Sequence, residues 1–208
     1  MTQSIANPIT KNINNPTTKR AQLRKEIRLR RNALTDAEQS KAAIDLISRL
    51  ANHSKIQQAQ HIAIYLSNDG ELSTVKFIEW CWQNNKDIYL PVLHPFSSGH
   101  LLFLHYQADT PLISNKYGIL EPKLDVTKVC PLNQLDVICT PLVAFDETGA
   151  RLGMGGGFYD RSLANWQQTK LYPMGLAHNC QQVEKVPVES WDIPLPEIIT
   201  PSKGFLFS

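Results

Sequence analysis

Residues 136–163, with the sequence DVICTPLVAFDETGARLGMGGGFYDRSL, join a short apolar run, a glycine-rich loop and a helical pattern. The apolar run at 136–145 is typical of an inner strand of a sheet. Four of the five residues at 153–157 are glycines, and we predict a helix over 157–167. Loops that lead from the carboxyl end of a strand into a helix are the usual ligand sites of α/β sheets. The stretch therefore predicts an α/β fold with a binding loop.

The glycine loop has the composition of a phosphate-binding backbone. Without Cβ atoms, the N–H groups of its glycines can turn toward one anion, and the dipole of the following helix adds to the attraction. Arg151 offers a positive charge to the same oxygens, and Asp160 can hold a cation that bridges phosphates. The two common phosphate motifs are absent, because no Gly-Lys pair occurs and Phe158 stands where G-x-G-x-x-G requires its third glycine. We predict a less common phosphate site with Mg²⁺; a flexible turn is the alternative.

The rest of the chain alternates between strand and helix patterns. We predict further strands at 61–66, 87–93, 101–106 and 171–177, helices at 19–34, 74–82 and after Thr35, and a proline-interrupted piece at 186–200. Such alternation indicates an α/β fold with a mostly parallel central sheet and helices on both of its faces. The polar residues 1–18 are typical of a disordered tail, and residues 19–208 are predicted to form one domain.

The helix predicted at 19–34 is strongly basic. Its apolar positions Leu23, Ile27 and Leu34 lie on one side, and a neighbouring stripe consists of four arginines, Arg20, Arg24, Arg28 and Arg31. The stripe can be a solvated face, an RNA-binding arm or a contact for phosphates. Thr35 and Glu38 form a capping-box pattern that predicts the start of the next helix.

Composition limits the class of protein. The chain has 208 residues, 42% of them apolar and 19% charged, with a net charge of +2, too small to indicate nucleic acid by itself. No stretch approaches the roughly 20 apolar residues of a membrane helix, and the first residues lack the pattern of a secretory signal. Four scattered cysteines then suggest reduced thiols. We expect a cytoplasmic monomer that binds small molecules and has no membrane or nucleic-acid partner.

One long segment carries a resemblance to a known family. Residues 140–163, TPLVAFDETGARLGMGGGFYDRSL, resemble the signature of the 5-formyltetrahydrofolate cyclo-ligase family, approximately P-x-x-x-F-D-x-x-G-x-R-L-G-x-G-x-G-[YF]-Y-D. Further matches follow in chain order: RAQLR at 20–24, IYLSNDGELST at 64–74, YGILEP at 117–122 and the aspartate of VPVESWD at 192. Together they span nearly all of residues 19–200.

The resemblance implies an ATP- and Mg²⁺-dependent ligase of one-carbon metabolism. The family closes 5-formyltetrahydrofolate to 5,10-methenyltetrahydrofolate and releases ADP and phosphate. The formyl oxygen is a poor leaving group, so it is phosphorylated by ATP before N10 attacks the formyl carbon. Phosphoryl transfer chiefly requires positioning and charge neutralisation, so no Ser/His/Asp nucleophile is expected. Two alternatives stay open: another Mg-ATP-dependent α/β phosphotransferase, and an RNA-binding protein that uses the basic helix.

The resemblance also assigns roles to residues. Arg151 and Asp160 would be catalytic, and Asp160 and Asp192 would bind Mg²⁺. Leu66, Glu71 and Tyr117 would contact the folate. The ATP-binding set would be Arg20, Arg24, Arg151, Leu152, Gly153, Met154, Gly155, Gly156, Gly157, Phe158 and Tyr159.

This chain departs from the family pattern at several of these positions. Arg20 stands where the family has Lys, and Lys19 could take its place toward ATP. Met154 and Gly156 stand where some relatives carry Arg and Lys, which increases the importance of Arg151 and the N-terminal arginines. Phe158 replaces the more usual Tyr, so a hydroxyl role there does not apply.

Overall fold

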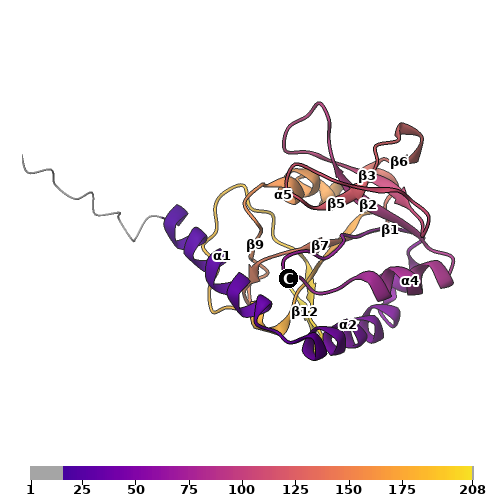
Figure 1. Cartoon of the computed structure of the whole chain (residues 1–208). Coiled ribbons are helices and arrows are strands. Elements are labelled where there is room, and N and C mark those ends of the chain that lie inside the picture. Colours follow the sequence, from indigo (N-terminus) through magenta and orange to yellow (C-terminus); the bar gives the residue numbers. More distant parts are fainter. Residues whose placement is uncertain (1–15, 208) are drawn as a thin grey trace, which may run out of the picture.

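The computed structural model describes residues 16–207, and a central sheet runs through this part of the chain (Figure 1). Its eight strands have the order β12-β11-β10-β7-β1-β2-β3-β6. Their bounds are β1 His61–Ala63, β2 Asp87–Leu93, β3 Leu101–Tyr106, β6 Val129–Cys130, β7 Val137–Pro141, β10 Tyr172–Leu176, β11 Glu197–Ile199 and β12 Gly204–Leu206. Two hairpins lie outside the sheet: β4 (Leu112–Ser114) pairs with β5 (Leu120–Pro122), and β8 (Ala144–Phe145) pairs with β9 (Arg151–Leu152).

The five inner strands are parallel, as the sequence predicts. β1 pairs in parallel with β2 and β7, and β10 pairs in parallel with β7 and β11. The antiparallel pairs are at the two edges, where β3 joins β2 and β6, and β12 joins β11. The carboxyl ends of the inner strands therefore meet along one side of the sheet, the usual side for ligands in such folds.

Helices cover both faces of the sheet. Their bounds are α1 Pro16–Asn32, α2 Asp36–Ala51, α3 Ser54–Gln58, α4 Val75–Gln83 and α5 Phe158–Leu163, with short 3₁₀ turns at Val126–Lys128, Leu132–Gln134, Trp166–Gln168 and Asn179–Gln181. α2 and α4 pack Leu46 and Phe77 against Ile62 on one face, and α5 packs Leu163 on the other (Figure 1). Figure 1 shows α1 beside the sheet, against the region of β9. In the described part of the chain, no helix is long and apolar enough to cross a membrane.

Several predicted elements are confirmed. The strands at 87–93 and 101–106 have the predicted bounds, and the Thr35–Glu38 capping box is formed at the start of α2. The basic helix is present as α1, and it buries Ile27 against Val143 and Leu152. These elements were predictable because their patterns depend on short-range spacing.

Other bounds were wrong. α1 begins at Pro16, so residues 16–18 belong to the helix rather than to the predicted tail; residues 1–15 lie outside the described residues. The strand predicted at 136–145 ends at Pro141, and the chain then leaves the sheet, because the N–H of Val143 donates to the carbonyl of Leu152 in the β8–β9 hairpin. The helix predicted at 157–167 ends at Leu163.

The carboxyl-terminal part of the chain forms more of the sheet than predicted. The proline-interrupted piece predicted at 186–200 contains β11, and β12 follows as the edge strand. Each of these strands has three residues, which is too short for an alternating pattern to identify. β11 is buried along its whole length, since it lies between β10 and β12.

Gly175 of β10 gives a stability test of this packing. A Cβ atom at this position would lie 2.7 Å from Leu142 Cδ2 and 2.9 Å from both Ile198 Cγ1 and Leu195 Cδ1. Overpacking of this kind costs roughly 1–3 kcal/mol. Gly175→Ala should therefore lower the midpoint of urea unfolding without changing its slope.

Gly204→Ala is the matched control, because a Cβ there comes no closer than 3.7 Å to Glu197 Oε1. Equal unfolding midpoints for the two variants would contradict the described contact between β10 and β11.

Candidate active site

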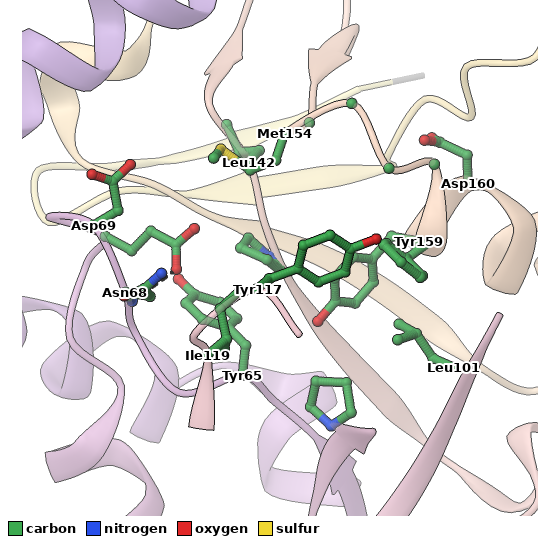
Figure 2. A pocket seen from close by; sticks show the side chains of 18 of the residues that line it. Tyr65, Asn68, Asp69, Leu101, Tyr117, Ile119, Leu142, Met154, Tyr159 and Asp160 are labelled. Carbon is green, nitrogen blue, oxygen red and sulfur yellow. Dashed lines mark hydrogen bonds between the residues drawn. The ribbon is translucent and has the colours of Figure 1, made fainter. Parts of the chain in front are cut away.

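A cavity of about 690 Å³ opens at the carboxyl ends of β1, β2 and β7. Its walls come from α1, the loop at 66–71, the β4–β5 hairpin, the glycine loop at 153–157 and the turn at 189–192. Figure 2 shows Asp69 at one side of the cavity, Asp160 at the other, and the rings of Tyr65, Tyr117 and Tyr159 between them. Segments far apart in sequence thus supply one site, and its two ends differ in chemistry.

The glycine loop requires glycine at two positions because of its backbone. Gly155 and Gly157 have φ values of 103° and 64°, which strain any residue with a Cβ atom. Gly156 does not have a positive φ, but a Cβ there would lie 2.5 Å from the ring of Phe158. Among residues 16–207, the N–H groups of these three glycines donate to no protein acceptor. They are therefore available to an anion.

The helix after the glycine loop contributes less to anion binding than the sequence predicts. α5 has six residues, so its dipole is weaker than that of the longer helix predicted from the sequence. Attraction for an anion at this end of the cavity must come mainly from the loop N–H groups and from nearby arginines.

Arg151 is a buried cation beside the glycine loop. Its Nη2 donates to Asp160 Oδ1 over 2.6 Å, and its side chain is 2% exposed. Among residues 16–207, its Nε has no hydrogen-bond partner. Burial lowers the pKa of Arg151, whereas the charges of Asp160 and Asp192 raise it. Asp160 Oδ1 also accepts from the N–H of Ile193, so Oδ2 is the oxygen left for another ligand.

Two arginines of α1 reach the same end of the cavity. Arg20 donates to both oxygens of Asp192, over 2.5 and 3.0 Å, and to the carbonyl of Pro187. Arg24 Nε donates to the carbonyl of Gly153 over 2.8 Å, and its guanidinium lies against Gly155. Burial and the nearby Arg20 lower the pKa of Arg24. In the described part of the chain, Arg24 forms no ion pair, so its charge is available to a ligand.

The opposite end of the cavity holds a buried carboxylate among aromatic rings. Glu71 Oε2 accepts from the N–H of Asn68, and burial raises the pKa of Glu71 to about 7 although the charge of Arg31 opposes the shift. Leu66 lines the cavity beside it. Tyr117, in the β4–β5 hairpin, is 56% exposed and meets the ring of Phe158 edge-on, with centroids 6.1 Å apart. This end suits a flat heterocycle with hydrogen-bond donors.

The comparisons with known proteins show the family of this chain. The sequence model of the 5-formyltetrahydrofolate cyclo-ligase family matches residues 16–201. The chain belongs to the 5-formyltetrahydrofolate cyclo-ligase family. It is 56% identical to the 5-formyltetrahydrofolate cyclo-ligase of Escherichia coli over 177 residues, covering 85% of this chain and 97% of the relative. It is 54% identical to the Haemophilus influenzae cyclo-ligase over 183 residues, covering 88% and 98%.

The fold of this cyclo-ligase family member also has a solved counterpart. An NMR structure of Aquifex aeolicus 5,10-methenyltetrahydrofolate synthetase superposes with a TM-score of 0.76 at 26% identity, covering 90% of this chain and 92% of that chain. The predicted family, the α/β fold class and the single domain with a mostly parallel sheet are confirmed.

The cavity of this cyclo-ligase family member brings together almost all the residues predicted for its site. Lys19 is exposed and does not line the cavity, whereas Arg20 does. Leu152 is the exception among the predicted set, because its side chain is fully buried in the core against α1. Any contact of Leu152 with a ligand is therefore limited to its main chain.

Several residues that line the cavity were not predicted as site residues. They include Arg31, Tyr65, Asn115, Glu121 and Trp191, which come from four segments, since Asn115 and Glu121 share the β4–β5 hairpin. Glu121 is buried and accepts from the N–H of Leu93 and from Asn115 Nδ2. Tyr65 and Glu121 stand within the matched stretches at 64–74 and 117–122, so the resemblance could have pointed to them. The place of Trp191 depends on the fold of the turn at 189–192, which has no local pattern.

Proposed function

We propose that this cavity is the place where the chain, as a member of its family, closes 5-formyltetrahydrofolate to 5,10-methenyltetrahydrofolate with ATP. The observation that carries the proposal is the pairing of two unlike ends in one space. One end has open loop N–H groups with Arg24 and Arg151, and the other has Glu71 among aromatic rings. A reaction between ATP and a folate needs both ends within reach of one another.

At the first end, the loop at 153–157 and its two arginines would hold the ATP phosphates. Loop N–H groups donate to phosphate oxygens, and charge-assisted bonds from guanidinium groups are roughly twice as strong as neutral ones. Arg20 would join them if it left Asp192 for a phosphate. Tyr159, in the first turn of α5, lines the cavity between the two ends.

Mg²⁺ fits the carboxylates of this end only in combination with the nucleotide. Among residues 16–207, no group of three or more His, Cys, Asp or Glu residues could hold a metal alone. Mg²⁺ commonly binds through one or two carboxylates, substrate phosphates and water. Asp160 would supply Oδ2, and Asp192 would become the second ligand when Arg20 turns to the phosphates. The ion would neutralise phosphate charge.

At the second end, Glu71 would accept hydrogen bonds from the pterin ring. Its carboxylate can receive the ring N–H and the exocyclic amino group, while Tyr117 covers the ring and Leu66 contacts its edge. The formyl group would then point toward the glycine loop. This orientation follows from the separation of the two ends, since the formyl oxygen must meet the γ-phosphate.

The chemistry would proceed in two steps. The formyl oxygen attacks the γ-phosphorus, and ADP leaves. N10 then attacks the activated carbon and loses its proton, and phosphate departs with the former formyl oxygen. Arg151 would stabilise the charge that develops on the transferred group, because its guanidinium is fixed by Asp160 and needs no rearrangement.

An oxygen-18 label in the formyl group tests both the reaction and its intermediate. The protein is incubated with labelled 5-formyltetrahydrofolate, Mg²⁺ and ATP, while absorbance at the methenyl band is followed and the released phosphate is analysed by mass. We expect methenyl product in step with ADP, and the label in phosphate. Label in water would overturn the phosphorylated intermediate. ATP turnover on another acceptor, without methenyl product, would favour the phosphotransferase alternative. RNA binding without ATP turnover would favour the RNA-binding alternative.

We also propose that the protein is a cytoplasmic monomer without a nucleic-acid partner. The four cysteines Cys81, Cys130, Cys139 and Cys180 are all free, as in a reducing compartment. The basic stripe of α1 faces the cavity, and Arg20, Arg28 and Arg31 already pair with carboxylates. This leaves less free charge for RNA than the sequence alone suggests.

A further inference from the structure

Arg31 is a fully buried arginine near the carboxyl end of α1, with no role in the reaction described so far. Its Nε donates to the carbonyl of Asp69 over 2.7 Å, and its Nη2 donates to Asp69 Oδ2 over 2.9 Å. Asp69 has a φ of 51°, in the left-handed region that a residue with a Cβ atom rarely adopts. Arg31 therefore helps to hold a strained turn. Glu71 lies in the same turn, two residues after Asp69.

The remaining nitrogen of Arg31 is directed at Glu71. Nη1 lies 3.8 Å from Glu71 Oε1, beyond hydrogen-bond distance. Among residues 16–207 it has no hydrogen-bond partner, although it is buried. A buried donor left without a partner lowers stability, so its presence calls for an explanation. Both residues line the cavity, and Arg31 stands behind the Glu71 carboxylate as a buried cation.

We propose that Arg31 is a positioning residue for folate binding: it fixes the turn that carries Glu71 and aligns the Glu71 carboxylate toward the pterin donors. The inference rests on the proposed function, because it takes Glu71 as the pterin contact. α1 then serves both ends of the cavity. Arg24 contacts the glycine loop, and Arg31, about two helical turns later, contacts the turn at 68–71.

The charges around Glu71 support this role. Burial and the charge of Asp69 raise the pKa of Glu71, whereas Arg31 lowers it. The phenols of Tyr65 and Tyr159 also face Glu71, and burial raises the pKa of each, so both are neutral at physiological pH. His178 lies against the backbone of the same turn, but burial lowers its pKa to about 4, so it adds no charge there. Arg31 is thus the cation that favours the carboxylate form of Glu71.

Equilibrium binding of 5-formyltetrahydrofolate and of ATP, measured separately by calorimetry, tests the proposal. Glu71→Gln and Arg31→Gln should each weaken folate binding at least about tenfold, as expected for a lost charge-assisted contact. The double variant should be no weaker than Glu71→Gln, since Arg31 acts through Glu71. ATP binding should be unchanged in all three proteins, which also verifies that they are folded.

Three further variants separate charge from loop support. Arg31→Lys keeps the charge and should recover part of the folate affinity. It also replaces Arg31→Gln in the binding test if that variant does not fold. Arg28→Gln removes another donor to Asp69, 2.6 Å from Oδ2, and should weaken folate binding less than Arg31→Gln. Arg30→Gln, on the exposed side of α1 with Glu26, should bind folate as the unaltered protein does.

The pH dependence of folate binding gives a readout that a purely structural role would not move. In the unaltered protein, affinity should fall as the pH drops through about 7, the pKa of Glu71, because the carboxylate form is the acceptor. Removing Arg31 removes the charge that lowers this pKa, so in Arg31→Gln the loss should begin at higher pH. Arg28→Gln should leave the profile in place.

The outcomes separate the inference from the function on which it rests. If Glu71→Gln leaves folate affinity unchanged, the proposed pterin contact is wrong, and the role of Arg31 is overturned with it. The second outcome is that Glu71→Gln weakens folate binding, the double variant shows the full, independent loss of both changes, and Arg31→Gln does not shift the pH profile. In that case the proposed function stands, and the positioning role of Arg31 is overturned.

Discussion

Arg151→Met is expected to lower the turnover of the cyclisation by about 10³-fold at saturating ATP and folate. Arg151 is the buried cation beside the glycine loop, and it is held by Asp160. Removing one preorganised donor to a developing negative charge typically costs 10²–10³ in turnover, and an arginine that stabilises phosphoryl transfer contributes about 10³–10⁵. The measurement is the initial rate of methenyl absorbance under saturating conditions, with ATP affinity determined alongside.

A double variant separates catalysis from folding. Arg151→Met leaves the Asp160 carboxylate without its ion-pair partner and should lower stability by up to about 3 kcal/mol. Arg151→Met/Asp160→Asn removes the unpaired charge, so thermal stability should return, while turnover should stay far below that of Asp160→Asn alone. Equal turnover in the double variant and in Asp160→Asn would show that Arg151 acts only as a structural residue.

Asp160→Asn should lower turnover by at least about tenfold, corresponding to about 1.4 kcal/mol in the barrier. Asparagine preserves the size of the side chain and an oxygen that can accept from Arg151, so stability should change little. It removes the negative charge proposed for Mg²⁺, and a metal site weakened in this way responds to mass action. Extra Mg²⁺ should therefore recover part of the lost rate.

The comparison is the initial rate against Mg²⁺ concentration, at saturating ATP and folate, for the unaltered protein and Asp160→Asn. The curve of the variant should shift to higher Mg²⁺ and reach a lower plateau. Superimposable curves would contradict the assignment of Asp160 to the metal and leave it only as the partner of Arg151.

The sequence was most informative where function depends on local backbone geometry. The glycine loop could be predicted because few other compositions allow such an open backbone. The strand that it follows was wrong, since the loop comes directly after β9 of the hairpin and not after the inner strand β7. The details of the loop could not be predicted: positive φ values fall at Gly155 and Gly157, whereas Gly156 is restricted by the ring of Phe158. The length of α5 was also overestimated: the helix ends at Leu163, and a separate 3₁₀ turn follows at Trp166–Gln168.

Long-range pairs were beyond the reach of sequence patterns. The stripe of arginines on α1 was predicted, but the partner of each arginine depends on contacts between residues far apart in the chain. Arg20 meets Asp192 across 172 positions, and Arg31 meets Asp69 across 38. The partners of a charged residue are determined by the folded chain, so periodicity can identify the face of a helix but not what it binds.

The proposed division of the cavity into a nucleotide end and a folate end can be tested by one steady-state measurement with two variants. The KM for ATP and the KM for 5-formyltetrahydrofolate are determined for Arg24→Ala and for Glu71→Gln, each with the other substrate saturating. Arg24→Ala should raise the KM for ATP by about 10-fold or more and leave the KM for folate within about twofold. Glu71→Gln should do the reverse. If both variants raise the KM of the same substrate, or if neither changes either value, the cavity is not divided as proposed.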